Sequence, residues 1–275
     1  QEREPRISTF PRNVKTMHNV LGALWGLLLG LTNVKFLKTI YGDSLMGDLQ
    51  TRPVGDANFS TSSVTAGANK VLRNTYMLLS MTLLFSAGMA GVAMAIEAPY
   101  MGWIPLIVAF ALLFAINKFK NSSVGIALVF LFTGILGFSL GPILNYYLAT
   151  QGGTQVVVSA LSMTGIIFLS LSGYALVTRK DFSFMAGFLM TGMWVVIGSI
   201  VLMLVGGLFG WQLSGLHLAI SAAIVILMSG FILFDTSRIL NGGETNYIMA
   251  TVSMYLSIYN LFTSLLHLFG AFGDD

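Results

Sequence analysis

Long apolar stretches separated by short polar breaks make up most of the chain from residue 76 onward. A helix needs about 20 mainly apolar residues to cross the hydrocarbon core of a bilayer. We expect membrane-spanning helices over residues 76–96, 103–117, 124–148, 156–177, 184–209, 213–234 and 247–272. The second of these stretches is short for a span. The pattern therefore predicts an all-α fold, a polytopic membrane bundle of seven transmembrane helices.

The basic residues of this region occur only in alternate breaks, and the breaks between them contain no Lys or Arg. They are Lys70, Arg73, Lys118, Lys120, Arg179, Lys180 and Arg238. Cytoplasmic loops of membrane proteins are enriched in Lys and Arg. We therefore expect the start of the seven-helix region in the cytoplasm and the C-terminus outside. A miscounted helix would scatter the basic residues over both faces, so their alternation also supports seven spans.

Residues 1–63 have a different pattern and are predicted to form an N-terminal extension to a membrane domain of residues 64–275. Residues 1–16 are polar and basic, residues 20–34 are apolar, and residues 43–63 have the composition of a polar linker. The apolar stretch is short for a span. We favour a helix that lies in the membrane interface, and a thin eighth span is the alternative.

Composition supports a membrane location and excludes several classes of function. The chain is 55% hydrophobic and 9% charged, whereas soluble domains carry about 25% charged residues. Membrane lipid is therefore an expected partner. The net charge of +3 is too small and dispersed to indicate a nucleic-acid partner. The absence of cysteine excludes disulfides and thiolate metal sites, and we expect no cofactor and no metal.

Asp235 is the main ionisable residue near a predicted span, at the cytoplasmic end of the sixth. Such groups are costly in lipid and are candidates for function. Arg238 lies three residues later on the same helical face. One interpretation is a local ion pair at a helix end. The other is a buried carboxylate that titrates and gates or binds a cation, either calcium or a proton.

Glu244 follows a turn formed by Asn241, Gly242 and Gly243 and precedes the seventh helix. A carboxylate is favourable at the positive end of a helix dipole, so we predict a capping role for it. The chain has no zinc-protease motif, nucleophile elbow or phosphate-binding loop. We therefore predict that the protein is not an enzyme and has no catalytic residues.

Glycine and proline mark a second feature, in the third predicted span. Gly141 and Pro142 lie inside it, and Pro142 should kink or break the helix because it removes a backbone hydrogen bond. Further glycines recur in the third and fifth spans at positions 134, 137, 187, 192 and 198. In lipid, small residues let helices approach closely, so we favour tight packing over a glycine-lined path for solute.

Several motifs together resemble the Bax inhibitor-1 (TMBIM) family, and most closely its bacterial YccA branch. The resemblance covers residues 64–273 and leaves the first 63 residues unmatched. It rests on KVLRNTYMLLSMTLLFSA at 70–87, FTGILGFSLGPILNYYL at 132–148, LVTRKDFSFMAG at 176–187, LHLAISA at 216–222 and ILFDTSRILNGGETNYIMATVSMYLSIYNLFTSLL at 232–266.

The resemblance implies six helices around a central seventh, and for the YccA branch it implies binding and modulation of the membrane AAA+ protease FtsH. Other members of the family are pH-sensitive calcium leaks, in which an acidic residue on the sixth helix pairs with an aspartate on the seventh. Asp235 matches the first position, but Ser253 and Ser257 stand at the seventh-helix positions. A single carboxylate facing serines cannot titrate as a coupled pair, which argues against calcium conduction by that mechanism.

Three functions are therefore compatible with the sequence. The first is a multi-pass regulator of FtsH in the bacterial inner membrane, with the mitochondrial inner membrane as the alternative location. The second is a calcium or proton leak centred on Asp235. The third is an accessory structural subunit of a larger membrane complex, docked through residues 1–63.

Overall fold

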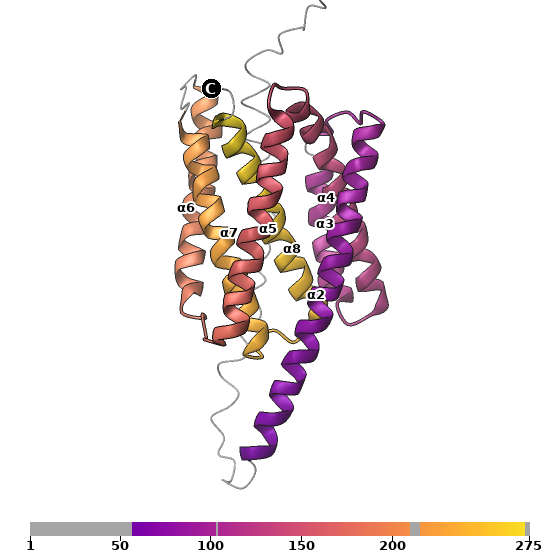
Figure 1. Ribbon diagram of the computed structural model, residues 1–275, viewed down its shortest axis with the longest axis vertical. Coiled ribbons are helices and arrows are strands. Elements are labelled where there is room, and N and C mark those ends of the chain that lie inside the picture. Colours follow the sequence, from indigo (N-terminus) through magenta and orange to yellow (C-terminus); the bar gives the residue numbers. More distant parts are fainter. Residues whose placement is uncertain (1–56, 103, 210–214, 273–275) are drawn as a thin grey trace, which may run out of the picture.

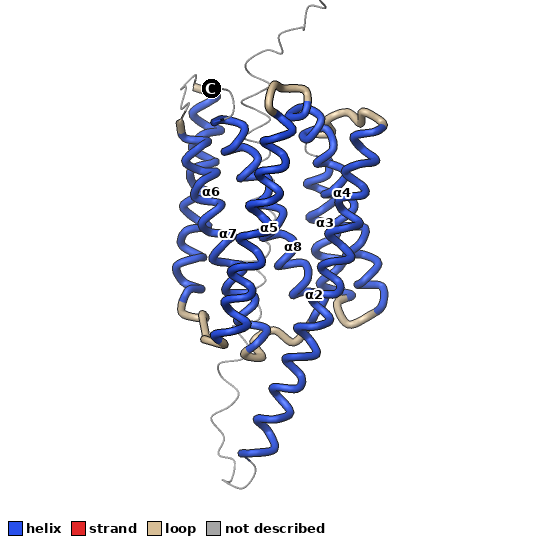
Figure 2. The backbone as a smooth tube through the Cα atoms, viewed as in Figure 1, coloured by secondary structure: helices blue, strands red, loops and turns tan. Residues whose placement is uncertain are grey.

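Seven helices make up the part of the chain that the computed structural model describes, which is residues 57–102, 104–209 and 215–272. They are α2 (Ala57–Ala95), α3 (Ile104–Phe119), α4 (Ser123–Leu148), α5 (Gly153–Thr178), α6 (Met185–Leu208), α7 (Leu216–Leu240) and α8 (Tyr247–Phe272). Figure 2 shows only helices and loops over these residues. Six of the helices are long and apolar enough to cross a membrane, and α3 is shorter, with 16 residues. The predicted polytopic helical membrane bundle is confirmed.

Helix α2 begins earlier than the sequence pattern indicated. Residues 57–63, which we assigned to the polar linker, are the first residues of this 39-residue helix. In Figure 1 the start of α2 projects beyond the bundle as a continuous helix. The predicted interfacial helix at residues 20–34, and the rest of the extension before residue 57, lie outside the described residues.

Helix α8 is the centre of the bundle. In its most apolar 18-residue stretch 89% of the residues are buried, against 17% for the corresponding stretch of α5. Helix α8 packs against α2, α4, α5 and α7, while α3 packs on α4 and α6 packs on α7. Large apolar side chains point outward from the surrounding helices, for example Leu84, Phe114 and Val177. An apolar exterior around a well-packed centre is the arrangement that a lipid solvent requires.

The glycines of α4 bring it close to α2, its most extensive neighbour. A Cβ atom at Gly137 would lie 2.6 Å from the Ser86 hydroxyl oxygen, and one at Gly134 would lie 2.7 Å from the Phe85 ring. The prediction of tight packing is confirmed for this helix. It is wrong for Gly187 and Gly198 of α6, where a Cβ would meet nothing within 4 Å, because α6 turns these residues away from its neighbours.

Pro142 does not end α4, which continues to Leu148. The predicted break is therefore absent, and a kink at this position stays a prediction. The helix remains continuous because Gly141 packs directly on Ala93 of α2 and the turn after the proline is held by the side chain of Asn145, which donates to the backbone oxygen of Met94 at 3.1 Å.

The two ends of the bundle differ in charge. We call the end that holds the α3–α4, α5–α6 and α7–α8 loops the basic end, because Lys118, Lys120, Arg179 and Lys180 lie there. The other we call the opposite end. The beginning of α2 and the end of α8 lie at different ends of the bundle in Figure 1, as an odd number of crossings requires. Which end faces the cytoplasm stays a prediction.

Candidate functional site

Asp235 lies inside the bundle near the basic end, between α7 and α8. Its residue is 4% exposed, and its carboxylate accepts a hydrogen bond from the hydroxyl of Ser253 on α8. The tight α7–α8 loop makes the two helices antiparallel neighbours, which brings together residues 18 positions apart. The structure therefore joins two of the predicted site residues. Ser257, one turn further into the bundle, is buried, but the structure records no hydrogen bond between it and Asp235.

Arg238 forms a salt bridge with Glu244. The Arg238 Nη2 atom lies 2.9 Å from Glu244 Oε2, and the two side chains are 7% and 11% exposed. The Arg238 Nε atom also donates to the backbone oxygen of Gly243 at 3.2 Å. The recorded salt bridge therefore joins Arg238 to the α7–α8 loop, although the Arg238 charge also acts on the Asp235 carboxylate, and the local Asp235–Arg238 ion pair stays a prediction. The loop brings the partners of the salt bridge together, because Gly242 adopts a φ of 75° and returns Glu244 to the last turn of α7.

Asn246 is a residue of this region that the sequence analysis missed. Its Oδ1 atom accepts hydrogen bonds from the backbone N–H groups of Ile248 and Met249 at 3.0 and 3.1 Å, so it caps the start of α8. Glu244, two residues earlier, accepts from the N–H of Asn246 at 2.9 Å and so supports this cap. An asparagine directly before a helical pattern is a strong capping signal and would have identified it.

Hydrogen bonds tie the loops of the basic end to the ends of α7 and α8. The Asn246 Nδ2 atom donates to the backbone oxygen of Lys120 at 3.0 Å and to the side chain of Asn121 at 2.9 Å. The Ser237 hydroxyl donates to the backbone oxygen of Lys180 at 2.9 Å and accepts from the N–H of Phe182 at 3.0 Å. The α3–α4 and α5–α6 loops are therefore fixed around the helix ends that flank Asp235.

A cluster of hydroxyl groups lies beside Asp235 in the sequence of α7. The Thr236 hydroxyl oxygen is 3.2 Å from that of Ser172 on α5, and the Ser172 hydroxyl is hydrogen bonded to that of Tyr76 on α2. The hydroxyl groups of Thr236, Ser172 and Tyr76 thus join α7, α5 and α2. The arrangement offers polar groups but, within the residues described, no set of three or more His, Asp or Glu side chains that could hold a metal ion.

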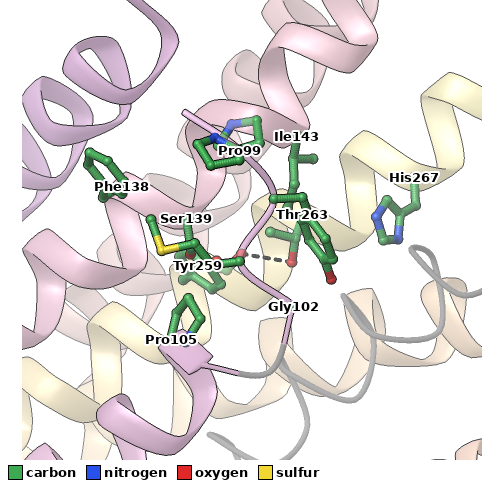
Figure 3. Close-up of a pocket in the computed structure, with 12 residues that line it drawn as sticks. Pro99, Gly102, Pro105, Phe138, Ser139, Ile143, Tyr259, Thr263 and His267 are labelled. Atoms are coloured by element: carbon green, nitrogen blue, oxygen red, sulfur yellow. Dashed lines mark hydrogen bonds between the residues drawn. The ribbon is translucent and has the colours of Figure 1, made fainter. Parts of the chain in front are cut away.

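A pocket opens at the opposite end of the bundle, between the α2–α3 loop, α4 and α8 (Figure 3). Its volume is about 30 Å³. Its polar lining residues include Ser139, Tyr259, Thr263 and His267. Pro142 also lines it, so one member of the predicted helix-break pair borders a cavity.

The arrangement of six helices around a buried C-terminal helix, with an acidic residue on the helix before it, matches the family that the sequence motifs resemble. The pattern of the family described as Bax1-I, inhibitor of apoptosis-promoting Bax1, matches residues 68–274. The chain belongs to the Bax inhibitor-1 family. The family assignment rests on almost all of the described residues, and it does not include the extension before residue 68.

Bacterial members of the Bax inhibitor-1 family are similar to this chain over nearly their whole length. The modulator of FtsH protease YccA of Escherichia coli is 49% identical over 208 residues, which are 75% of this chain and 92% of YccA. An uncharacterized membrane protein of Vibrio cholerae is 48% identical over 219 residues, which are 78% of this chain and 96% of that protein. A Pseudomonas aeruginosa protein of unknown function is 48% identical over 206 residues, or 74% and 90% of the two chains.

Proposed function

We propose that this chain is an inner-membrane regulator that binds and modulates the membrane AAA+ protease FtsH, and that it is not an enzyme. The observation that carries the proposal is the similarity to the E. coli modulator of FtsH protease, at 49% identity over 92% of that protein. A second E. coli relative with the same identity is named as an inner membrane protein. That membrane location agrees with the bundle of apolar helices in this chain.

Two features of the fold support a role as a protein that resists extraction by such a protease. The central helix α8 is buried along most of its length, so unfolding it would expose polar and apolar groups together. The loops of the basic end are also held by hydrogen bonds from Ser237 and Asn246. In this proposal the motor engages the polar leader, residues 1–16, and is slowed by the bundle behind it.

The test is capture of FtsH from native bacterial membranes by the full 275-residue chain after crosslinking, with degradation of another membrane substrate measured in parallel. We expect the full chain to capture FtsH and to slow that degradation. A variant that lacks residues 1–16 is the matched control, and it should lose most of both effects. Solubilised full-length chain that carries no FtsH after crosslinking would refute the proposal. Full capture by the shortened variant would refute the role of the leader.

The second candidate function is a calcium or proton leak centred on Asp235. The observation that favours it is the burial of this carboxylate between α7 and α8, where its hydrogen-bond partner is the hydroxyl of Ser253. Flux into liposomes should fall in Asp235→Asn and remain in the control Glu97→Gln, which alters an exposed carboxylate in the α2–α3 loop. Equal flux through the wild type and Asp235→Asn would dismiss this function.

A further inference from the structure

Asn260 is a buried polar residue that neither candidate function uses. It lies in the half of α8 nearer the opposite end, and it is 1% exposed. Neither its Nδ2 nor its Oδ1 atom has a hydrogen-bond partner within the described residues. Buried side-chain polar atoms are nearly always hydrogen bonded, and an exception calls for an explanation such as a bound water.

Protein and lipid around Asn260 offer few hydrogen-bond partners for its side-chain amide. The hydrocarbon around a membrane bundle offers no donors or acceptors. The backbone oxygen of Asn260 accepts from Thr263 at 3.1 Å, but no residue that the structure describes pairs with the side-chain amide. An amide group supplies two donors and an acceptor, which suits a neutral ligand that both donates and accepts. Water has this chemistry.

The pocket at the opposite end provides a way in for water. Roughly 10–15 Å³ is enough for one water molecule, so a pocket of about 30 Å³ has room for about two. Thr263 and His267 of α8 line this pocket. The backbone oxygen of Phe138, which also lines it, lacks its usual helical donor because Pro142 has no N–H. The pocket thus contains acceptors for water.

The face of α8 that carries Asn260 leads to this pocket. Ser264 and His267 follow Asn260 at intervals of four and seven residues, which places all three on one side of the helix. Ser264 is buried, and its small polar side chain separates Asn260 from the pocket-lining His267. In Figure 3, His267 projects from α8 beside the pocket.

We propose that water enters the bundle through the pocket at the opposite end, passes Ser264, and binds to the side-chain amide of Asn260. The path of the water ends at Asn260, in the middle of α8, where the amide forms a buried hydration site. This site lies more than one helical turn from Ser253, the partner of Asp235, so it is distinct from the carboxylate site at the basic end.

The test is hydrogen–deuterium exchange of the full chain in lipid nanodiscs, read by mass spectrometry along α8. We expect residues 257–267 to exchange faster than residues 248–256, because amide exchange requires water at the amide. Residues 248–256 are all buried, and residues 257–267 are buried except for Phe262 and His267. Asn260→Leu should slow exchange in residues 257–267 several-fold. Thr251→Val, which removes a buried hydroxyl from the other half of α8, is the matched control and should leave residues 257–267 unchanged.

A second variant keeps the test decisive if Asn260→Leu does not fold. Ser264→Leu places a large apolar side chain between the pocket and Asn260. It should slow the exchange of residues 257–267 while leaving the Asn260 side-chain amide in place. An experimental structure at a resolution that shows water should have density within hydrogen-bonding distance of the Asn260 amide. Equal protection of both halves of α8, or exchange unaffected by either leucine variant, would overturn the proposal.

Discussion

Gly137 is the position where the packing of this bundle can be tested most sharply, by substitution with alanine. The new Cβ atom would lie 2.6 Å from the Ser86 hydroxyl oxygen, 2.8 Å from its carbonyl carbon, and closer still to its carbonyl oxygen. Because ordinary contacts begin near 3.4 Å, α2 and α4 would have to separate by roughly 1 Å in a close-packed interior. Backbone atoms cannot rotate away as the end of a flexible side chain can.

The cost follows from two effects. Forcing extra volume into a packed core costs about 1–3 kcal/mol. The movement would also disturb the hydrogen bond between the Ser86 and Tyr255 hydroxyls, which is 2.6 Å long and worth about 1 kcal/mol. Alanine gains about 1 kcal/mol over glycine in a helix. Gly198→Ala is the matched control, since it has the same gain and a Cβ there meets nothing within 4 Å.

The difference between the two variants removes the helix-propensity gain and isolates the packing cost. We expect Gly137→Ala to be about 2–4 kcal/mol less stable than Gly198→Ala. The free energy of unfolding can be measured from circular dichroism in mixed detergent micelles with increasing dodecyl sulfate. If both alanine variants unfold at the same dodecyl sulfate fraction, the close approach of α2 and α4 is not what stabilises the bundle.

The remaining predictions concern the basic end and use the same unfolding assay. Glu244→Gln should lower the free energy of unfolding by about 3 kcal/mol because it removes the charge that Glu244 presents to the buried Arg238. A decrease of less than about 1 kcal/mol, as for a solvent-exposed ion pair, would contradict this geometry. Asn246→Ala should cost about 1 kcal/mol as a lost cap, whereas Asn246→Asp should retain most of the stability. Ser253→Ala should cost about 2 kcal/mol because the hydroxyl is hydrogen bonded to the carboxylate of Asp235, and Ser253→Thr should restore part of it. If Ser253→Ala were as stable as the wild type, the hydrogen bond between Ser253 and Asp235 would not form in the membrane.

The apolar pattern predicts every helix that the structure describes. Predicted and observed bounds agree closely for α4 (Ser123–Leu148) and α8 (Tyr247–Phe272). They agree because apolar length is a direct requirement of the bilayer and needs no knowledge of neighbouring helices. The start of α2 was missed for the same reason, since residues 57–63 are polar and extend the helix beyond the apolar stretch.

The candidate site was only partly accessible to sequence reasoning. The family resemblance indicated Ser253 and Ser257 as the positions opposite Asp235, and the structure has a hydrogen bond from Ser253. Spacing alone suggested that Arg238 pairs with Asp235, because residues three apart share a helical face. In the structure the α7–α8 loop brings Glu244 back to Arg238, and the recorded salt bridge is between these two residues.

The chain's apolar pattern indicates a membrane location and the helices that the structure describes, because apolar length depends on the solvent around each stretch. Its sequence motifs indicate the family. The partners of its buried polar groups depend instead on how loops and helices meet in space. Asn260 shows the distinction. Its place in an apolar helix is plain from the sequence, but the tertiary structure alone shows that its amide is buried with no hydrogen-bond partner in the described part of the chain. A side chain's hydrogen bonds are set by neighbours that are distant along the chain, and no local pattern records them.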